Sequence, residues 1–229
     1  AAIVEKDTDE SVRGAAAIAL GRVGGKEAVD ALSALMRNRN YPVLSCYAAI
    51  GLGLTRQPDA LPVLVEGFAS KQVNILTASA VGVALLGREE GAKPLEEALA
   101  NKNHPILREY AAVALGKLSP PGASARLAEC MKDTAFEVRH AAAIGLGLLG
   151  DPAACPVLEA ALKDRQEAVR ATAALSFDLL TDDEQRALTL GAQFKADPRN
   201  QNGRRVGPAE ATRLLNSFLP KDYRLPIVP

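Results

Sequence analysis

The sequence repeats itself every 31 or 32 residues, and this period constrains the fold more than any other feature. The clearest copy of the repeat runs from Val138 to Asp164. Its apolar residues recur at helical spacing in two segments, which Gly150-Asp151-Pro152 separates. Each repeat is therefore predicted to be a helical hairpin, and the chain a stack of such hairpins.

Two separate columns of residues keep one register along the chain. A glycine follows the alanine-rich run of four repeats, with Ala84 and Asp178 at the corresponding positions of the other two, and the steps are 32, 31, 32, 31 and 31 residues. A leucine of the second helix recurs at matching steps, which chance periodicity would not produce. The glycines are Gly21, Gly53, Gly116 and Gly147, and the leucines are Leu32, Leu64, Leu95, Leu127 and Leu158.

This register predicts where the helices begin. First helices are expected to start near Ser11, Pro42, Val73, Pro105, Phe136 and Glu167. Second helices are expected to start near Lys26, Ala60, Gly91, Gly122, Ala153 and Thr181.

The pattern ends near residue 194. Residues 195–229 are predicted to form a loop, a helix over residues 208–219 and a tail, because an end repeat has to cover its open apolar face. The expected fold is thus all-α: an α-solenoid of about six stacked antiparallel helix pairs over residues 1–194, with an atypical C-terminal cap over residues 195–229. Because the chain begins partway through a repeat, we expect it to be part of a longer chain or complex.

The repeated pattern of Val-Arg, paired alanines and a closing Leu-Gly resembles HEAT repeats of the short type that also occurs in phycobilisome bilin lyases. Val12-Arg13, Leu107-Arg108, Val138-Arg139 and Val169-Arg170 carry the resemblance best. It implies an α-solenoid whose usual work is binding other proteins. It also implies that the second helices line the concave face.

Charge and hydropathy disfavour two classes of partner. The chain has 27 basic and 27 acidic residues, and residues 1–194 have 20 basic against 24 acidic, so a groove that attracts DNA is not expected. The longest apolar run, Ala141 to Gly150, is half of the roughly 20 residues that a membrane span requires. We therefore expect no nucleic-acid partner and no helix that spans a membrane.

The sequence contains no pattern that predicts catalysis, a metal or a cofactor. Its three cysteines have no regular spacing and are expected to remain thiols, and His104 and His140 have no His-Glu motif beside them. The Gly-X-Gly strings at 51–53 and 145–147 lie inside predicted helices, where we expect them to allow close packing rather than to bind phosphate.

A column of arginines is expected to hold each hairpin on the next. In three repeats an aspartate stands six residues before the arginine, whereas Ser45 and Leu76 replace the arginine in repeats that also lack the acid. Only Arg108 breaks the rule, with Lys102 six residues before it. Each guanidinium is expected to bond a loop carboxylate and loop carbonyls, and Ser45→Ala to cost little stability. The residues of this ladder are Arg13, Arg108, Arg139, Arg170, Asp7, Asp133 and Asp164.

The two repeats without the arginine permit two interpretations. Tyr47 and Tyr110 occupy a column that is alanine in other repeats, and Tyr41 and Asn74 lie in the same region. These residues could mark a widened joint or a local pocket. Alternatively, the large side chains only fill gaps in the packing.

Acidic residues recur on the predicted second helices. They would form a stripe that meets a basic or amide-rich peptide once per repeat, or else an ordinary solvated face. The stripe comprises Glu66, Glu97 and Glu129, with Glu96 and Glu159 on the neighbouring column.

The function predicted from these observations is a non-catalytic scaffold that binds a protein or peptide segment through the concave groove of the solenoid. The alternative, which the resemblance implies, is a subunit of a bilin lyase-like or other cofactor-modifying enzyme.

Overall fold

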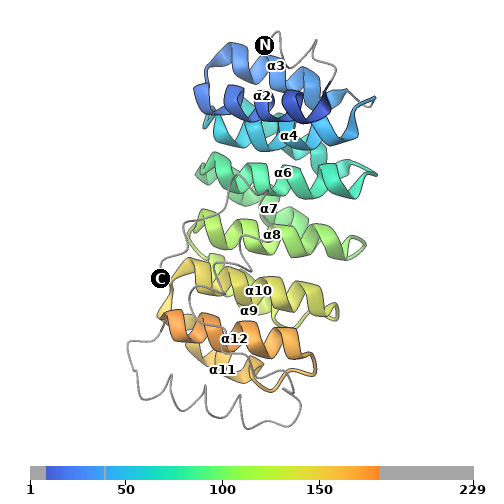
Figure 1. Cartoon of the computed structure of the whole chain (residues 1–229). Coiled ribbons are helices and arrows are strands. Elements are labelled where there is room, and N and C mark those ends of the chain that lie inside the picture. Colours follow the sequence, from blue (N-terminus) through green and yellow to red (C-terminus); the bar gives the residue numbers. More distant parts are fainter. Residues whose placement is uncertain (1–8, 39, 181–229) are drawn as a thin grey trace. The chain divides into compact units, whose positions relative to one another are not determined.

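The computed structural model describes residues 9–38 and 40–180, and all the regular structure in this part of the chain is helical (Figure 1). The chain divides into two compact units, Ala1–Pro120 (unit 1) and Pro121–Pro229 (unit 2). The second helix expected from Thr181 and the cap expected over residues 195–229 lie outside the described residues.

Unit 1 contains helical hairpins that follow one another along the chain. Its first helices are α2 (Glu10–Val23), α4 (Pro42–Leu54), α6 (Val73–Leu86) and α8 (Pro105–Leu118). Its second helices are α3 (Lys26–Arg37), α5 (Ala60–Glu66) with the 3-10 turn η1 (Gly67–Ala69), and α7 (Ala92–Ala100), which follows η2 (Glu89–Gly91).

Unit 2 has the same alternation. Its helices are α9 (Ala123–Cys130), α10 (Phe136–Leu149), η3 (Pro152–Ala154), α11 (Cys155–Ala161) and α12 (Glu167–Leu180). In both units the first helices begin within one residue of the predicted starts. The all-α stack of antiparallel helix pairs is therefore confirmed.

Local chemistry explains where these helices begin and end. Asp9 caps α2 by accepting a hydrogen bond from the Ser11 amide at 2.8 Å. Pro42 opens α4 at a position where a missing N–H leaves no bond unmade. Gly87 and Gly150 follow α6 and α10 in the left-handed region, with φ of 66° and 74°, where glycine carries no steric penalty.

Three consecutive first helices of unit 1, α2, α4 and α6, are in backbone contact with their neighbours. A Cβ added to Gly21 would lie 2.7 Å from the Gly51 Cα and would also overlap the Gly51 carbonyl oxygen. A Cβ added to Gly53 would lie 2.8 Å from the Gly82 Cα in the same way. The Gly-X-Gly string at 51–53, which was predicted to allow close packing, therefore does so between α4 and its two neighbours, α2 and α6.

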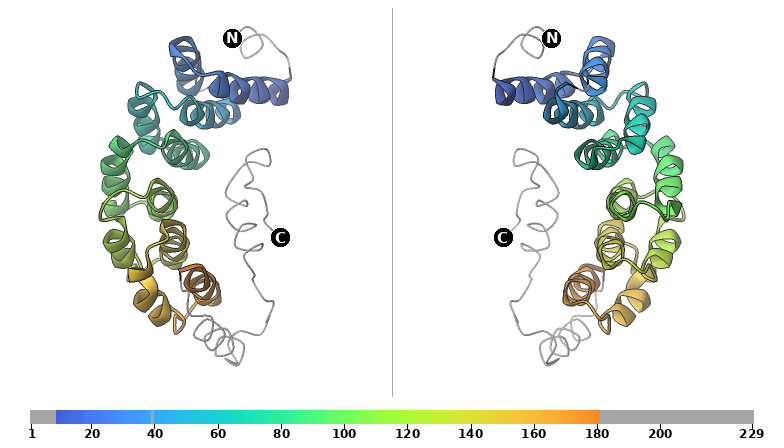
Figure 2. Two further views of the ribbon diagram at one scale, coloured as in Figure 1. Left: turned by 90° about the vertical axis from the view of Figure 1, so that its left-hand side faces the viewer. Right: turned by 90° about the vertical axis from the view of Figure 1, so that its right-hand side faces the viewer.

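The second helices of unit 1 lie further apart from one another than the first helices do, and buried leucine and valine side chains fill the space between the two rows. Two rows with different spacing make the stack bend toward the closer row. Within unit 1 the first helices accordingly lie on the inner side of the bend and the second helices on the outer side (Figure 2). The expectation that second helices line the concave face is wrong for this unit.

The joints of α4 are narrow rather than wide. A Cβ on Gly51 would lie 2.8 Å from the Ala17 carbonyl oxygen, and one on Gly82 would lie 2.6 Å from that of Ala49. The Tyr47 ring covers Gly14, where a Cβ would approach the ring carbons to 2.8 Å. The widened joint is therefore excluded, and Tyr47 fills space that the absent glycine side chain leaves.

Candidate functional site

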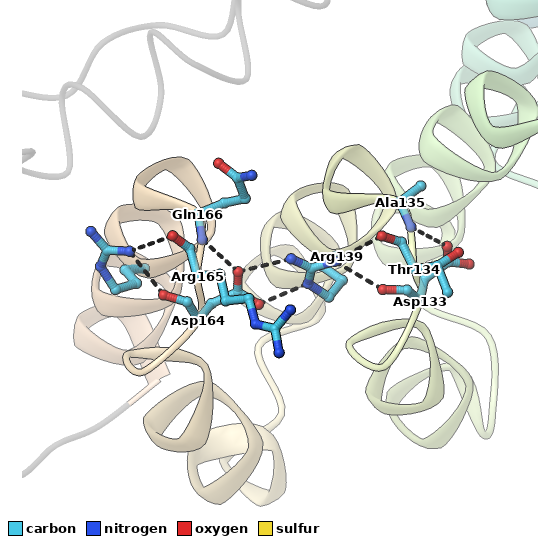
Figure 3. A network of polar contacts seen from close by, with 8 residues as sticks. Asp133, Thr134, Ala135, Arg139, Asp164, Arg165 and Gln166 are labelled. Atoms are coloured by element: carbon cyan, nitrogen blue, oxygen red, sulfur yellow. Dashed lines mark hydrogen bonds and ion pairs between the residues drawn. The ribbon is translucent and has the colours of Figure 1, made fainter. Parts of the chain in front are cut away.

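Arg139 joins two consecutive hairpins of unit 2 (Figure 3). Its Nε and Nη2 donate to the two carboxylate oxygens of Asp164 at 2.7 and 2.9 Å. Its Nη1 donates backward to the carbonyl oxygens of Asp133 and Thr134, at 2.9 and 3.3 Å. The two side chains of the ion pair are each only 14% exposed. One guanidinium thus holds the loop before its own helix and the loop of the next hairpin.

The other arginines show what the residue six positions earlier contributes. Arg170 donates to the carbonyl oxygens of Asp164 and Arg165, and Arg108 to those of Asn101 and Lys102, over 2.8–3.1 Å. A backbone carbonyl is present whatever the side chain, which explains why Lys102 can stand in this position. The expected pairing of Arg139 with the Asp133 carboxylate is replaced by pairing with Asp164, 25 residues later.

Asp133 and Asp164 also order the loops in which they lie. Asp133 Oδ1 accepts a hydrogen bond from the Ala135 amide at 2.9 Å, and Asp164 Oδ1 accepts one from the Gln166 amide at 2.8 Å. Both bonds close turns immediately before first helices. Each of these aspartates therefore fixes the start of a helix with its carboxylate, and each also accepts hydrogen bonds from an arginine of the ladder.

Arg13 reaches forward in unit 1 by a different contact. Its guanidinium carbon lies 4.4 Å from the centre of the Tyr41 ring, in the loop before α4. A cation above an aromatic face is attracted by the ring quadrupole. Arg13 thus touches the loop of the following hairpin, as Arg139 does. Asp7, its expected partner, lies outside the described residues.

Ser45 takes over the loop contacts at a position without arginine. Its Oγ is fully buried and lies 3.2 Å from the carbonyl oxygens of both Asn38 and Tyr41. Both carbonyl oxygens also accept a backbone hydrogen bond, the Asn38 oxygen from the Tyr41 amide and the Tyr41 oxygen from the Ser45 amide. The small cost expected of Ser45→Ala therefore stays a prediction, because each of these carbonyls keeps a donor when the hydroxyl is removed. Leu76, the other replacement, is an apolar core residue that is 1% exposed.

The joint between α10 and α12 is expected to weaken in acid. The hydrogen bonds from Arg139 hold the pKa of Asp164 below its ordinary value. A carboxyl group with a lowered folded-state pKa adds stability above its unfolded pKa of about 3.9, and this stability is lost as pH falls through the folded value. Urea unfolding of the native chain and Asp164→Asn between pH 7 and pH 3 should therefore show a difference that shrinks below about pH 4. A constant difference would contradict this assignment.

The acidic residues predicted to recognise a peptide lie on the second helices. Glu66 is paired with Arg37 of the preceding second helix by two hydrogen bonds of 2.8 and 2.9 Å, which lower its pKa. Glu129 lies 3.8 Å from Arg126 on its own helix. Glu97 is exposed, and Glu96 and Glu159 are half-buried. Glu66, Glu96 and Glu97 are in unit 1, where they belong to the outer row of helices.

The inner row of unit 1 carries an uncharged face across α4 and α6. Neither helix contains an acidic or basic residue, whereas each of the other first helices contains at least two. Val43 and Val73 are 51% and 47% exposed. We call this surface the α4/α6 face; its exposed and half-buried residues are Val43, Cys46, Leu54, Val73, Asn74, Thr77, Val81 and Leu85.

Cys46 adds to the neutral character of this face. Burial raises the pKa of its thiol to about 11, so the group is protonated at neutral pH. Its Sγ lies 3.3 Å from the Pro42 carbonyl oxygen, to which it donates. All three cysteines of the described residues are free thiols, as expected.

Other chemistry is limited in this part of the chain. Among residues 9–38 and 40–180, no three His, Cys, Asp or Glu side chains form a group that could bind a metal ion. None of the helices in these ranges is long and apolar enough to cross a membrane. Within the described structure, the α4/α6 face is the surface that calls for a functional explanation.

Sequence reasoning overlooked this face although a signal was present. Two consecutive first-helix segments, residues 42–54 and 73–86, lack all charge in a chain with 24% charged residues. Buried and surface aliphatic residues alternate along each of these helices, so apolar composition alone does not show which of them are exposed. Whether an aliphatic residue is buried or exposed depends on whether its side of the helix faces a neighbouring helix.

Comparison with known proteins places the chain in a family. The family model for HEAT repeats matches residues 1–84 and 92–178. A HEAT repeat-containing taxis protein of Halobacterium salinarum is 35% identical over 132 residues, which is 58% of this chain and 29% of the relative's length.

A solved structure shows the same fold. In the complex of CpcE and CpcF of phycocyanin lyase from Nostoc sp. PCC7120, one chain superposes with a TM-score of 0.56 at 23% identity, over 96% of this chain and 86% of that chain. At this identity the likeness concerns the fold alone. With two hairpin-forming segments matched by the family model and the hairpins described above, the protein belongs to the HEAT-repeat family.

Proposed function

We propose that this protein is a non-catalytic scaffold that binds a protein segment on the α4/α6 face of unit 1. The observation that carries the proposal is the absence of charge from two adjacent first helices whose surface valines are about half exposed. Solvent-exposed aliphatic side chains gathered on one side of a stack mark a site of association. On this proposal, the segment shared with the Halobacterium taxis protein is a protein-binding array.

The chemistry of the face defines the partner's contact surface. A charged partner group would be desolvated there without an opposite charge on α4 or α6 to compensate it. Aliphatic and aromatic side chains would instead bury Val43, Val73 and Val81, at roughly 1 kcal/mol for each half-exposed valine. Asn74 and Thr77 supply hydrogen-bonding groups between the valines and can orient the partner. The partner is thus an apolar or amphipathic protein segment.

Charge placed on the face should abolish binding. Val43→Glu and Asn74→Glu put one carboxylate on each of two neighbouring helices at exposed positions, so folding should be unaffected. We expect the double variant to bind at least tenfold more weakly to a partner isolated with the native chain, which corresponds to about 1.4 kcal/mol. Isothermal titration calorimetry measures the change, with circular dichroism as the check on folding.

The predicted acidic stripe provides the matched control. Glu66→Lys with Glu97→Lys changes charge by a larger amount on the second helices of the same unit. This variant should retain native affinity. Loss of binding in the lysine variant with retention in the glutamate variant would transfer recognition to the acidic stripe and contradict the proposal.

A further inference from the structure

Four large apolar or aromatic side chains are exposed where the first helices of unit 1 begin. Val43 and Ile106 are the second residues of α4 and α8, and Val73 is the first residue of α6. They are 51%, 39% and 47% exposed. Tyr41, the residue immediately before α4, is 40% exposed. Because α4 packs on α6 and α6 packs on α8, these side chains form one row across three helices, which we call the N-terminal row.

Tyr41 is held in place within the unbound protein. Its amide donates to the Asn38 carbonyl oxygen at 3.3 Å, and its own carbonyl oxygen accepts from the Ser45 amide at 3.0 Å. The buried guanidinium of Arg13 covers one face of the Tyr41 ring. The exposed area of the ring is therefore on its other face and edge. A fixed aromatic side chain loses little conformational entropy on binding, so Tyr41 is suited to receive an apolar side chain of a partner.

The opposite ends of the same helices have a different character. Leu54 and Leu85, in the last turns of α4 and α6, are half-buried. The helices on either side carry exposed cations there, Arg22 in the last turn of α2 and Lys117 in the last turn of α8. An apolar segment that crossed the first helices at this end would desolvate both charges. The N-terminal row is therefore the direction in which the α4/α6 face can extend.

Two lysines lie beside the N-terminal row in the loops that precede its helices. Lys71 and Lys102 are exposed and lie 31 residues apart, before α6 and α8. Each is the middle residue of a turn closed by one hydrogen bond, from the amide of the residue after it to a side-chain oxygen of the residue before it, at 3.1 and 3.2 Å. The described residues of the loops before α4, α6 and α8 include no acidic residue, whereas the corresponding loops of unit 2 contain Asp133 and Asp164. The loop edge beside the row is therefore basic.

We propose that the N-terminal row and its two lysines bind an acidic amphipathic segment of a partner protein. The proposal rests on the proposed function, because Val43 and Val73 belong to the α4/α6 face, and it extends that face to α8. Aromatic and aliphatic side chains of the segment pack on the row. Aspartate or glutamate side chains on its neighbouring side meet Lys71 and Lys102, which are about one helix spacing of 8–10 Å apart. A basic segment meets like charge at both lysines and is disfavoured.

Peptide selection tests the proposal. A phage-displayed library of random twelve-residue peptides is selected on the native chain, and the selected peptides are then measured on Lys71→Glu with Lys102→Glu, the loop variant. We expect these peptides to combine an aromatic residue, aliphatic residues and net negative charge, and to bind the loop variant at least tenfold more weakly. Their affinity for the native chain should fall as NaCl rises from about 0.05 M to about 0.5 M, and this dependence should be lost in the loop variant.

Lys93→Glu with Lys117→Glu is the matched control. It changes the net charge by the same amount at exposed positions of unit 1. Lys117 lies about 18 Å along α8 from its start, more than twice the Debye length of about 8 Å at physiological salt. The selected peptides should bind this variant within threefold of the native chain. Tyr41→Ala should weaken binding at least tenfold, whereas Tyr41→Phe, which keeps the ring, should not, and circular dichroism checks that every variant folds.

The outcomes separate this proposal from the proposed function. Peptides that bind the loop variant and Tyr41→Ala as tightly as the native chain, but not Val43→Glu with Asn74→Glu, would overturn the acidic segment and leave the α4/α6 face as the binding site. Selected peptides with net positive charge would overturn it as well. Peptides that bind Val43→Glu with Asn74→Glu at native affinity would contradict the proposed function, and the role of the N-terminal row with it.

Discussion

Replacing Gly53 by alanine should destabilise unit 1 by about 3 kcal/mol, in the range of severe overpacking. The same substitution in an unconstrained helix stabilises it by about 1 kcal/mol, because alanine favours the helical backbone. The new methyl group would overlap the backbone of α6 at Gly82, 2.8 Å from its Cα. Backbone in a helix cannot rotate aside as a flexible side chain can, so α4 and α6 would have to separate. Urea unfolding followed by circular dichroism measures the loss.

Ala15→Gly is the control for helix propensity. Ala15 is exposed on α2, so removing its methyl group should lower stability by no more than about 1 kcal/mol. If Gly53→Ala stabilised the protein instead, α4 and α6 could not be in backbone contact and the explanation of the inner row would fail.

Arg139→Ala should cost about 2 kcal/mol, because it removes the guanidinium that pairs with the Asp164 carboxylate and donates to two loop carbonyls. Arg139→Lys should recover only part of the loss, since an ammonium group cannot bond both carboxylate oxygens in the fork geometry of arginine. A double-mutant cycle with Asp164→Asn isolates the pairwise coupling, which we expect to exceed 1 kcal/mol.

The Arg37–Glu66 pair is the matched control for this experiment. It has the same two-bond geometry, but its side chains are 54% and 55% exposed rather than 14% each. Solvent screens exposed charges, so Arg37→Ala should cost about 0.2–1 kcal/mol. Equal losses at Arg37 and Arg139 would show that burial does not strengthen the Arg139 contact.

The helices were predictable because the repeat period and the residues that begin or end helices indicate the same boundaries. Pro42 and Pro105 open first helices where a proline is tolerated, and Gly87 and Gly150 follow helices where a left-handed residue is needed. Both signals lie within a few residues of the boundary that they specify. Local sequence therefore located the start of each first helix to within one residue.

The partners of each side chain were less predictable because they depend on distance across repeats. Counting six residues back from Arg139 finds Asp133, whose carbonyl oxygen accepts from the guanidinium, whereas the carboxylate hydrogen-bonded to Arg139 is that of Asp164, one repeat further on. Both aspartates satisfy the same sequence rule. Which of the two aspartates an arginine side chain reaches depends on the distance between the loops of consecutive hairpins, and the sequence rule does not contain that distance.

The row of helices on the inner side of the bend is also set by the spacing between helices within each row, which the repeat pattern does not specify. The Gly-X-Gly string at 51–53 predicts close packing, but this prediction was not carried to its consequence for curvature. Helices in backbone contact form the shorter row, so the glycine-bearing helices must be the inner ones. The acidic residues on the second helices of unit 1, Glu66, Glu96 and Glu97, were placed on the wrong side for this reason.

The glycine contacts also give unit 1 a preferred direction of deformation. Backbone touching backbone cannot be compressed, whereas side chains between the second helices can repack in other rotamers. A bending motion would therefore pivot at the two backbone contacts, Gly21–Gly51 between α2 and α4 and Gly53–Gly82 between α4 and α6. Because the α4/α6 face lies on the same inner row as these contacts, it would keep its shape while the outer helices spread or close.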